Sequence, residues 1–114
     1  MRPSVIFHIT TAAQWAQAQA SGRYEADSLV GEGFIHCSTG GQVARVANAG
    51  FRGQPGLVVL HIDEDAVGVP VRYENLEGGE ELFPHLYGPL PAAAVAQATP
   101  LLPGPSGEFA FSAD

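Results

Sequence analysis

The chain has 114 residues, of which 46% are hydrophobic and 15% are charged, and it contains 14 glycines and 9 prolines. This composition is typical of one folded domain with short elements and frequent turns, and it excludes long solvated helices and extensive disorder. Five basic against twelve acidic residues give a formal net charge of −7, so nucleic acid and anionic membrane surfaces are disfavoured as partners.

The use of cysteine and the N-terminal residues indicate the compartment. The single cysteine, Cys37, cannot form an internal disulfide, which is typical of a reducing environment. Residues 1–9 have only a short apolar run, too brief for the core of a signal peptide or for a membrane span. We therefore expect a cytoplasmic protein with no membrane partner.

The first predicted unit is a strand followed by a helix. Residues 5–9 are β-branched and aromatic, which is typical of a strand. Residues 12–20 are rich in Ala and Gln, and they follow Thr11, which forms a helix-capping pattern with Gln14. Gly22 stands where this helix should end.

The second predicted unit has the same plan. A polar connection around Tyr24 leads to a short apolar strand at residues 34–37. Thr39 and Gln42 repeat the capping pattern before apolar residues at helical spacing, and Gly50 should end this second helix.

The second half of the chain is richer in strands. Residues 57–62 form the longest apolar run and predict the central, most buried strand. Residues 69–73 predict another strand, whereas residues 82–90 contain two prolines and a glycine and predict an ordered loop that carries function. Residues 91–95 predict one helical turn, and residues 95–102 predict the last strand.

These elements predict an α+β fold in a single small domain, residues 1–114. We expect its core to span about residues 4–102, because residues 103–114 form a tail rich in Gly and Pro with a polar end. No internal repeat interrupts this plan.

Two histidines have the same sequence context. His8 lies at the end of a predicted strand, just before Thr10, and His36 lies at the end of the next, just before Ser38. If the strands are neighbours, imidazoles, hydroxyls and helix N-terminal amides meet, a combination that suits a phosphate or ribose ligand. The alternative is that each histidine is a packed strand residue whose ring is hydrogen-bonded.

A third histidine, His85, lies in the predicted loop close to Glu80 and Glu81. The carboxylates, the imidazole and the phenol of Tyr87 could act as base, ligand contact and stacking platform. The alternative is that Phe83 and Tyr87 fill the core while the loop has no chemical role.

Other chemistry has less support from the sequence. His8, His36 and His85 with a carboxylate are suitable metal ligands, but no tight ligand spacing supports a metal site, so we expect none. His61 lies in the most buried strand and should belong to the core. Cys37 should face away from its neighbour His36, towards the core. Four arginines could form one positive pocket on this acidic chain: Arg23, Arg45, Arg52 and Arg72.

Three runs, residues 6–10, 32–38 and 83–89, resemble the signature runs of the Domain of Unknown Function 952 family in order and spacing. The resemblance spans almost the whole chain. That family is grouped with the ADP-ribosyltransferase-like fold, so the resemblance implies a split β-sheet with two main short helices around a cleft for NAD. By motif position it also implies that His8 contacts a ribose and that His36 lines the nicotinamide side.

The branches of this fold differ in their catalytic residues. Members that resemble RNA 2′-phosphotransferases use paired histidines with arginines, but the scarcity of basic residues here argues against an RNA substrate. Protein-modifying branches use a glutamate on a later strand, and Glu74, Glu80 and Glu81 all remain candidates for it. The acceptor, including any protein substrate, stays open.

The leading hypothesis is a domain that binds NAD or a related nucleotide and acts as an NAD-dependent glycosyltransferase, moving ADP-ribose or a phosphate-linked group. The alternatives are a non-catalytic binding or regulatory module and a histidine-centred metal-dependent hydrolase. The candidate catalytic residues are His36, Glu81 and His85. The candidate ligand-binding residues are His8, Thr10, Ser38, Arg72 and Tyr87.

Overall fold

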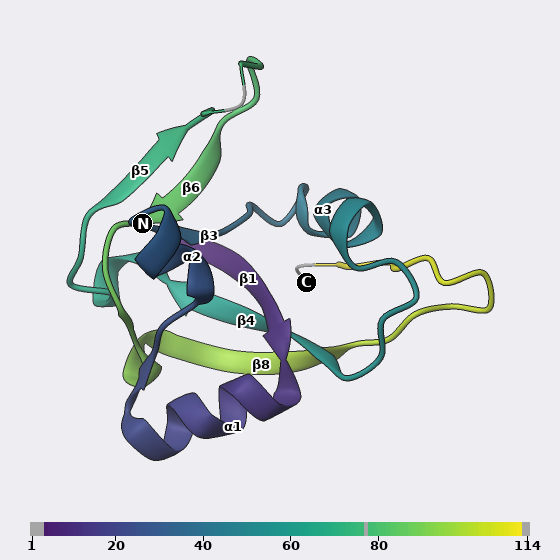
Figure 1. Ribbon diagram of the computed structural model, residues 1–114, viewed down its shortest axis with the longest axis horizontal. Helices are drawn as coiled ribbons and strands as arrows, with labels where there is room; N and C mark the ends of the chain where they lie inside the picture. Colours follow the sequence, from purple (N-terminus) through teal and green to yellow (C-terminus); the bar gives the residue numbers. More distant parts are fainter. Residues whose placement is uncertain (1–3, 77, 113–114) are drawn as a thin grey trace.

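Two three-stranded antiparallel sheets form the framework of the chain (Figure 1). The computed structural model describes residues 4–76 and 78–112. Residues 1–3, 77, 113 and 114, which the expected domain and its tail include, lie outside this description. Helices and antiparallel sheets share one unit, so the expected α+β class is confirmed.

The first sheet has the strand order β1-β4-β8. Both β1 (Val5–Thr11) and β8 (Val95–Leu101) pair antiparallel with β4 (Leu57–Asp63). Leu60 and Ile62 of β4 are fully buried, as expected for a continuous apolar run. The prediction that this run forms the central, most buried strand is therefore confirmed.

The second sheet has the strand order β3-β6-β5. Its middle strand β6 (Phe83–Leu86) pairs with β3 (Ile35–His36) on one side and with β5 (Val71–Glu74) on the other. The two sheets meet where Phe7 and Ser38 exchange backbone hydrogen bonds of 2.8 and 2.7 Å. The junction thus joins β1 of the first sheet to the residue two positions after β3 of the second.

The prediction of an ordered loop over residues 82–90 is wrong for the part that forms the strand β6. Pro84 lies within this strand, and its carbonyl accepts a hydrogen bond of 3.0 Å from the N–H of Cys37. Proline has no N–H to donate, but Pro84 lies opposite the end of β3. The missing donor therefore removes little of the hydrogen bonding between β3 and β6.

Both predicted helices are confirmed, and so is the Thr11 cap of the first, whereas the second begins after Gln42 without a side-chain cap. The Thr11 hydroxyl accepts a backbone N–H of the first turn of α1 (Ala12–Ser21) at 3.1 Å. The Gln42 side chain accepts the N–H of Thr39 at 2.9 Å, just before α3 (Val43–Gly50). Over residues 4–76 and 78–112, no helix is both long and apolar enough to cross a membrane.

Several short elements complete the chain. β2 (Arg23–Tyr24) pairs with β7 (Leu90–Pro91), and α2 (Asp27–Gly31) follows β2. The sequence predicted only a polar connection there, which is wrong, because elements of two and five residues are too short to show a hydrophobic period. Single 3₁₀ turns occur at η1 (Glu64–Ala66) and at η2 (Ala92–Ala94), and the second is the predicted helical turn.

The first sheet is buried on both faces. Neighbouring residues of β1 point to opposite sides, so Ile6 faces one core and Phe7 the other. The first core, on the side of α1, consists of Ile6, Ala18, Tyr24, Ile35, Cys37, Leu60, Ile62, Val67, Leu86, Leu90 and Ala94. The second core, on the side of α3, consists of Phe7, Ile9, Val43, Ala47, Leu57, Val59, Leu101 and Phe109.

The C-terminal segment contributes to the second core. Phe109 is only 4% exposed. Its backbone carbonyl accepts a hydrogen bond of 3.0 Å from the Asn48 side chain of α3, and its N–H donates one of 2.7 Å back to Asn48. The core therefore extends beyond residue 102, because an aromatic side chain anchors a segment whose composition suggested a tail.

We predict that Phe109→Ala lowers the free energy of unfolding by about 3 kcal/mol, because it leaves a cavity in the second core. Leu102→Ala is the matched control, since Leu102 lies in the same part of the chain but is 73% exposed. Its effect should be about 0.5 kcal/mol or less. Urea denaturation of both variants measures the difference, and equal effects would mean that the segment does not stabilise the fold.

Candidate functional site

A cavity of about 540 Å³ lies between α3 and the hairpin formed by β5 and β6. Its volume is within the range of roughly 300–1,000 Å³ that is typical of small-molecule sites. We call it the cleft. It is lined by the following described residues: His8, Ile9, Glu32, Phe34, His36, Cys37, Ser38, Arg45, Val46, Ala49, Gly50, Phe51, Glu74, Asn75, Leu76, Phe83 and His85.

The structure brings the three histidines singled out in the sequence to one cleft. His8, His36 and His85 all line it, and the ring centroids of His36 and His85 are 5.4 Å apart. His8 comes from β1 of the first sheet, whereas the other two face each other across the β3-β6 pair of the second. The junction of the two sheets is thus what places the three imidazoles together.

His85 is held by a carboxylate and by an aromatic ring. Its Nδ1 lies 3.0 Å from Oε1 of Glu74, and the Tyr87 hydroxyl donates to the same oxygen. The imidazole is stacked on Phe34, with centroids 4.2 Å apart and an angle of 20° between the planes. Because the carboxylate only accepts hydrogen bonds, Nδ1 is the donor in this contact, and in the neutral ring Nε2 is the acceptor.

The charge of Glu74 is maintained by these two donors. The Tyr87 hydroxyl, and then His85, hold the pKa of the Glu74 carboxyl below its ordinary value. The same contact raises the pKa of Tyr87, because the phenol would have to ionise beside a carboxylate. Glu74 is therefore an ionised acceptor at the edge of the cleft.

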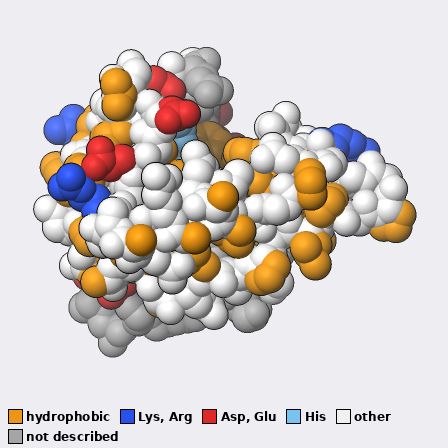
Figure 2. Space-filling model, turned by 60° about the horizontal axis from the view of Figure 1, so that its bottom comes forward, with side chains coloured by type: hydrophobic (Ala, Val, Ile, Leu, Met, Phe, Trp, Pro, Cys, Tyr) orange, Lys and Arg blue, Asp and Glu red, His pale blue; other side chains and the backbone are white. Residues whose placement is uncertain are grey.

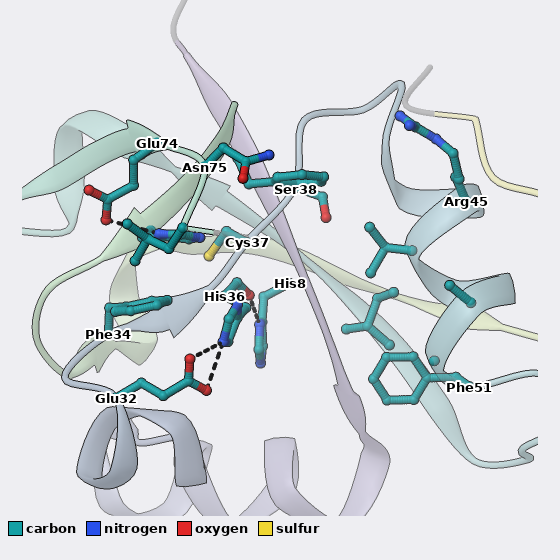
Figure 3. Close-up of a pocket in the computed structure, with 17 residues that line it drawn as sticks. His8, Glu32, Phe34, His36, Cys37, Ser38, Arg45, Phe51, Glu74 and Asn75 are labelled. Carbon is teal, nitrogen blue, oxygen red and sulfur yellow. Dashed lines mark hydrogen bonds and ion pairs between the residues drawn. The ribbon is translucent and has the colours of Figure 1, made fainter. Parts of the chain in front are cut away.

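His36 is more exposed than the other two histidines. Its Nε2 lies 3.1 and 3.2 Å from the two carboxylate oxygens of Glu32, but about half of its side chain is exposed. The ring also packs edge-on against Phe34 at 4.8 Å. In Figure 3, Phe34, His36 and Glu32 lie on the same side of the cleft. Solvent screens the pairing with Glu32, so His36 is free to exchange it for a contact with a ligand.

His8 is fully engaged by the protein. Its Nδ1 lies 2.5 Å from the His36 carbonyl oxygen, and its Nε2 lies 2.8 Å from the Tyr24 hydroxyl. The Tyr24 hydroxyl is also 3.1 Å from the Thr10 hydroxyl, which is bonded to Gln14. Burial lowers the pKa of His8 to about 4, so its ring is neutral at physiological pH. The Tyr24 hydroxyl donates to the Thr10 hydroxyl, and both ring nitrogens of His8 have a partner within the protein.

The opposite wall of the cleft is apolar. It consists of Ile9 from β1, Val46 and Ala49 from α3, and Phe51 just after this helix. Figure 3 shows Phe51 on the other side of the cavity from His8 and His36. Sequence reasoning did not identify Phe34 or Phe51 as part of the site, although the position of Phe34, two residues before His36 on the same predicted strand, was a usable signal.

Glu81, one of the candidate catalytic residues, is tied to α3. The Arg45 guanidinium donates hydrogen bonds of 2.7 and 2.5 Å to its two oxygens, and the Gln42 amide donates a third of 3.0 Å. Arg45 and then Gln42 lower the pKa of Glu81. Among the three glutamates that the sequence left open, Glu74 lines the cleft, whereas Glu80 and Glu81 are not among its described lining residues.

The remaining candidate ligand-binding residues lie at different depths. Ser38 lines the cleft, and its backbone forms the junction with Phe7. Thr10 is buried beside Tyr24 and is not among the lining residues described above. Arg72 and Tyr87 are not among the lining residues described above. Tyr87 is hydrogen-bonded to the lining residue Glu74, and the Arg72 guanidinium lies 4.9 Å from the centroid of the Tyr87 ring.

The expectation of one positive pocket is wrong. Arg23 pairs with Glu25, Arg45 with Glu81 and Arg52 with Glu108, each on a different part of the fold. Arg72 lies over Tyr87. The arginines visible in Figure 2 lie at opposite ends of that face. Three of these arginines are therefore paired with different glutamates and the fourth lies over an aromatic ring, so they do not form one cluster.

Two other groups have structural positions. Cys37 is buried in the first core as well as bordering the cleft, and burial raises the pKa of its thiol, so it is not a thiolate nucleophile. His61 lies 2.9 Å from the Thr99 hydroxyl and edge-on to Phe7. In the part of the chain that the structure describes, no set of three or more His, Cys, Asp or Glu side chains is placed to hold a metal ion.

We predict that His8 makes the fold sensitive to acid. Its pKa is about 4 in the folded chain, against the ordinary 6.5. As the pH falls through this window, the unfolded chain binds a proton that the folded chain does not, so the free energy of unfolding decreases. The full shift corresponds to about 3 kcal/mol.

Guanidinium denaturation across this pH window checks the prediction, with His8→Asn as the comparison. Asparagine keeps a donor near the His36 carbonyl but does not titrate, so the variant should show a flatter pH profile. The pKa of His61 is also lowered by burial, and its contribution should remain in both proteins. Parallel profiles would mean that His8 does not titrate as stated.

Comparisons with known proteins agree with this architecture. The model of the family described as "Protein of unknown function (DUF952)" matches residues 9–98. Two crystal structures of the protein CC0527 from Caulobacter crescentus, one of a double mutant, are each 35% identical to this chain over 94% of both chains, with a TM-score of 0.84.

A solution NMR structure of CC0527 is 36% identical and covers 91% of this chain and 90% of that one, with a TM-score of 0.80. No curated protein matches the chain. The match to the family model covers well over half of the sequence. The chain therefore belongs to the DUF952 family.

Proposed function

We propose that the cleft binds NAD or a related nucleotide and that the chain has an ADP-ribosyltransferase-like fold. The observation that carries the proposal is the contrast between the two walls of one cleft. One wall offers the imidazoles of His36 and His85, and the other offers the apolar surfaces of Val46 and Phe51. A nucleoside has the matching halves, a planar ring and a ribose with several hydroxyls.

The apolar wall suits the ring of such a ligand. Aromatic rings stack or meet edge to face, and Phe34 and Phe51 border the cleft from opposite sides. The imidazole wall suits the ribose, because the half-exposed ring of His36 can exchange its contact with Glu32 for one with a sugar hydroxyl. The few polar groups in an otherwise apolar cleft would then orient the ligand.

The arrangement of the strands supports the fold assignment. The sheets β1-β4-β8 and β3-β6-β5 meet at the junction of Phe7 and Ser38 and diverge beyond it, and the cleft is lined by residues of both. This agrees with the split sheet implied by the family resemblance. The longer helices, α1 and α3, correspond to the two short helices expected for such a domain.

The charges around the cleft suit the ring and the ribose of a dinucleotide better than its phosphates. Arg45 is the basic residue among the described lining residues, and it already pairs with Glu81. Glu32 and Glu74 add negative charge on the imidazole wall. The residues present therefore fit the ring and ribose, and they offer little attraction to phosphates, which we assign to the rim near Arg45.

Calorimetry with NAD, ADP-ribose and nicotinamide tests the proposal. We predict measurable heat with NAD and a loss of affinity of about tenfold in His36→Asn and in Phe51→Ala, the equivalent of one lost polar or aromatic contact. Leu102→Ala, an exposed change outside the cleft, serves as the control and should bind as the wild type does. No heat with any of the three compounds, for correctly folded protein, would remove the proposal.

A further inference from the structure

Glu74, His85 and Tyr87 form a hydrogen-bonded unit in which one carboxylate oxygen receives both donors. Glu74 on β5 reaches His85 on β6 diagonally, because the register pairs Glu74 with Phe83 and Arg72 with His85. An oxygen that already accepts two hydrogen bonds is a poor proton acceptor. The proton acceptor that this unit presents is instead Nε2 of His85.

The orientation of His85 is fixed by its surroundings. The side chain is 6% exposed and stacked on Phe34. A flip of the ring would place Cδ2 beside the carboxylate and so remove the hydrogen bond between Nδ1 and Glu74. Among the residues described, none is hydrogen-bonded to Nε2 of His85. Every fully buried side-chain nitrogen or oxygen in the described chain has a partner, so an Nε2 without one is not fully buried. Because His85 lines the cleft, this nitrogen is in contact with the open space of the cleft.

The other cleft histidines are held differently. Both ring nitrogens of His8 are bonded within the protein. His36 also places one ring nitrogen, Nε2, on a carboxylate, that of Glu32, but both side chains are about half exposed, so solvent competes for this contact. His85 is the one of the three whose ring is buried, oriented by a carboxylate and left with a ring nitrogen available to the cleft.

We infer that His85 is a general base, oriented by Glu74, that activates water or an acceptor hydroxyl against the ribose of the bound nucleotide. This inference rests on the proposed nucleotide function and specifies the reaction that the cleft would perform. A positioned carboxylate behind an imidazole is the arrangement that a general base of this kind needs. His85 is the catalytic residue, and Glu74 is a positioning residue.

The step is balanced with water or an alcohol as the only co-reactant. Nε2 of His85 takes the proton of the attacking O–H group as its oxygen forms a bond to the anomeric carbon of the ribose. The bond from this carbon to the ring nitrogen of nicotinamide breaks, and its electron pair neutralises the pyridinium charge. The imidazolium that results is stabilised by the ionised Glu74 and then loses its proton to solvent.

The tautomer of His85 provides the first test and needs no ligand. We predict that nitrogen NMR of the wild type shows the neutral ring protonated on Nδ1. Glu74→Leu should abolish this preference, whereas Tyr87→Phe, which removes only the second donor to the same carboxylate, should retain it. A wild-type ring protonated on Nε2 would overturn the inference.

Turnover provides the second test. Purified protein is incubated with NAD, with and without cell extract as a source of acceptors, and free nicotinamide is measured by chromatography. Nicotinamide is released whichever hydroxyl attacks, so one measurement covers hydrolysis and transfer. We expect His85→Gln to lower kcat at least about 100-fold while the calorimetric Kd for NAD changes by no more than about threefold.

Two further variants complete this experiment. Glu74→Gln should lower kcat at least about tenfold, because a neutral amide stabilises the imidazolium less. Glu108→Gln makes the same change of charge on an exposed residue outside the cleft and should leave kcat unchanged. If His85→Gln does not fold by circular dichroism, Glu74→Gln and the tautomer measurement decide the question.

The outcomes separate the two proposals. NAD that binds to the wild type without any release of nicotinamide overturns the general base and leaves nucleotide binding intact. Release at the wild-type rate by folded His85→Gln has the same meaning. A failure of NAD, ADP-ribose and nicotinamide to bind removes both proposals together.

Discussion

The junction between β1 and the residues that follow β3 is the contact on which the site depends. Phe7 and Ser38 exchange two backbone hydrogen bonds there, and the His8 side chain adds a third link to the His36 carbonyl. These bonds join two sheets that share no other strand pairing in the described chain. Without them the histidines of the two sheets would not border one cleft, and the aromatic side chains around them would have no common space to enclose.

Local signals in the sequence were sufficient for much of this arrangement. The repeated context of His8 and His36 indicated that they would lie together, and the capping residues Thr11 and Gln42 indicated where the helices begin. Other features depend on tertiary contacts that no local pattern carries. Because Pro84 is unusual within a strand, the sequence did not predict the strand β6. Nothing near Glu74 in the sequence indicates that the strand register brings Glu74 to His85.

The distribution of negative charge explains how an acidic chain can build this site. Three glutamates around the site each accept hydrogen bonds from specific donors. Glu32 is paired with an imidazole, and Glu74 with an imidazole and a phenol. Glu81 is paired with a guanidinium and an amide. Carboxylates held in this way position side chains instead of simply repelling one another.

The contact between Asn48 and Phe109 also bears on how the cleft is completed during synthesis. Phe109 is added to the growing chain 61 residues after Asn48. At the usual rates of elongation this takes roughly 3 to 12 s. Until then the apolar side of α3 lacks its last packing partner, although the helix and β1 have already been made. The wall of the cleft that α3 forms therefore becomes fixed late, and a nascent chain would acquire this binding surface only after Phe109 has been made.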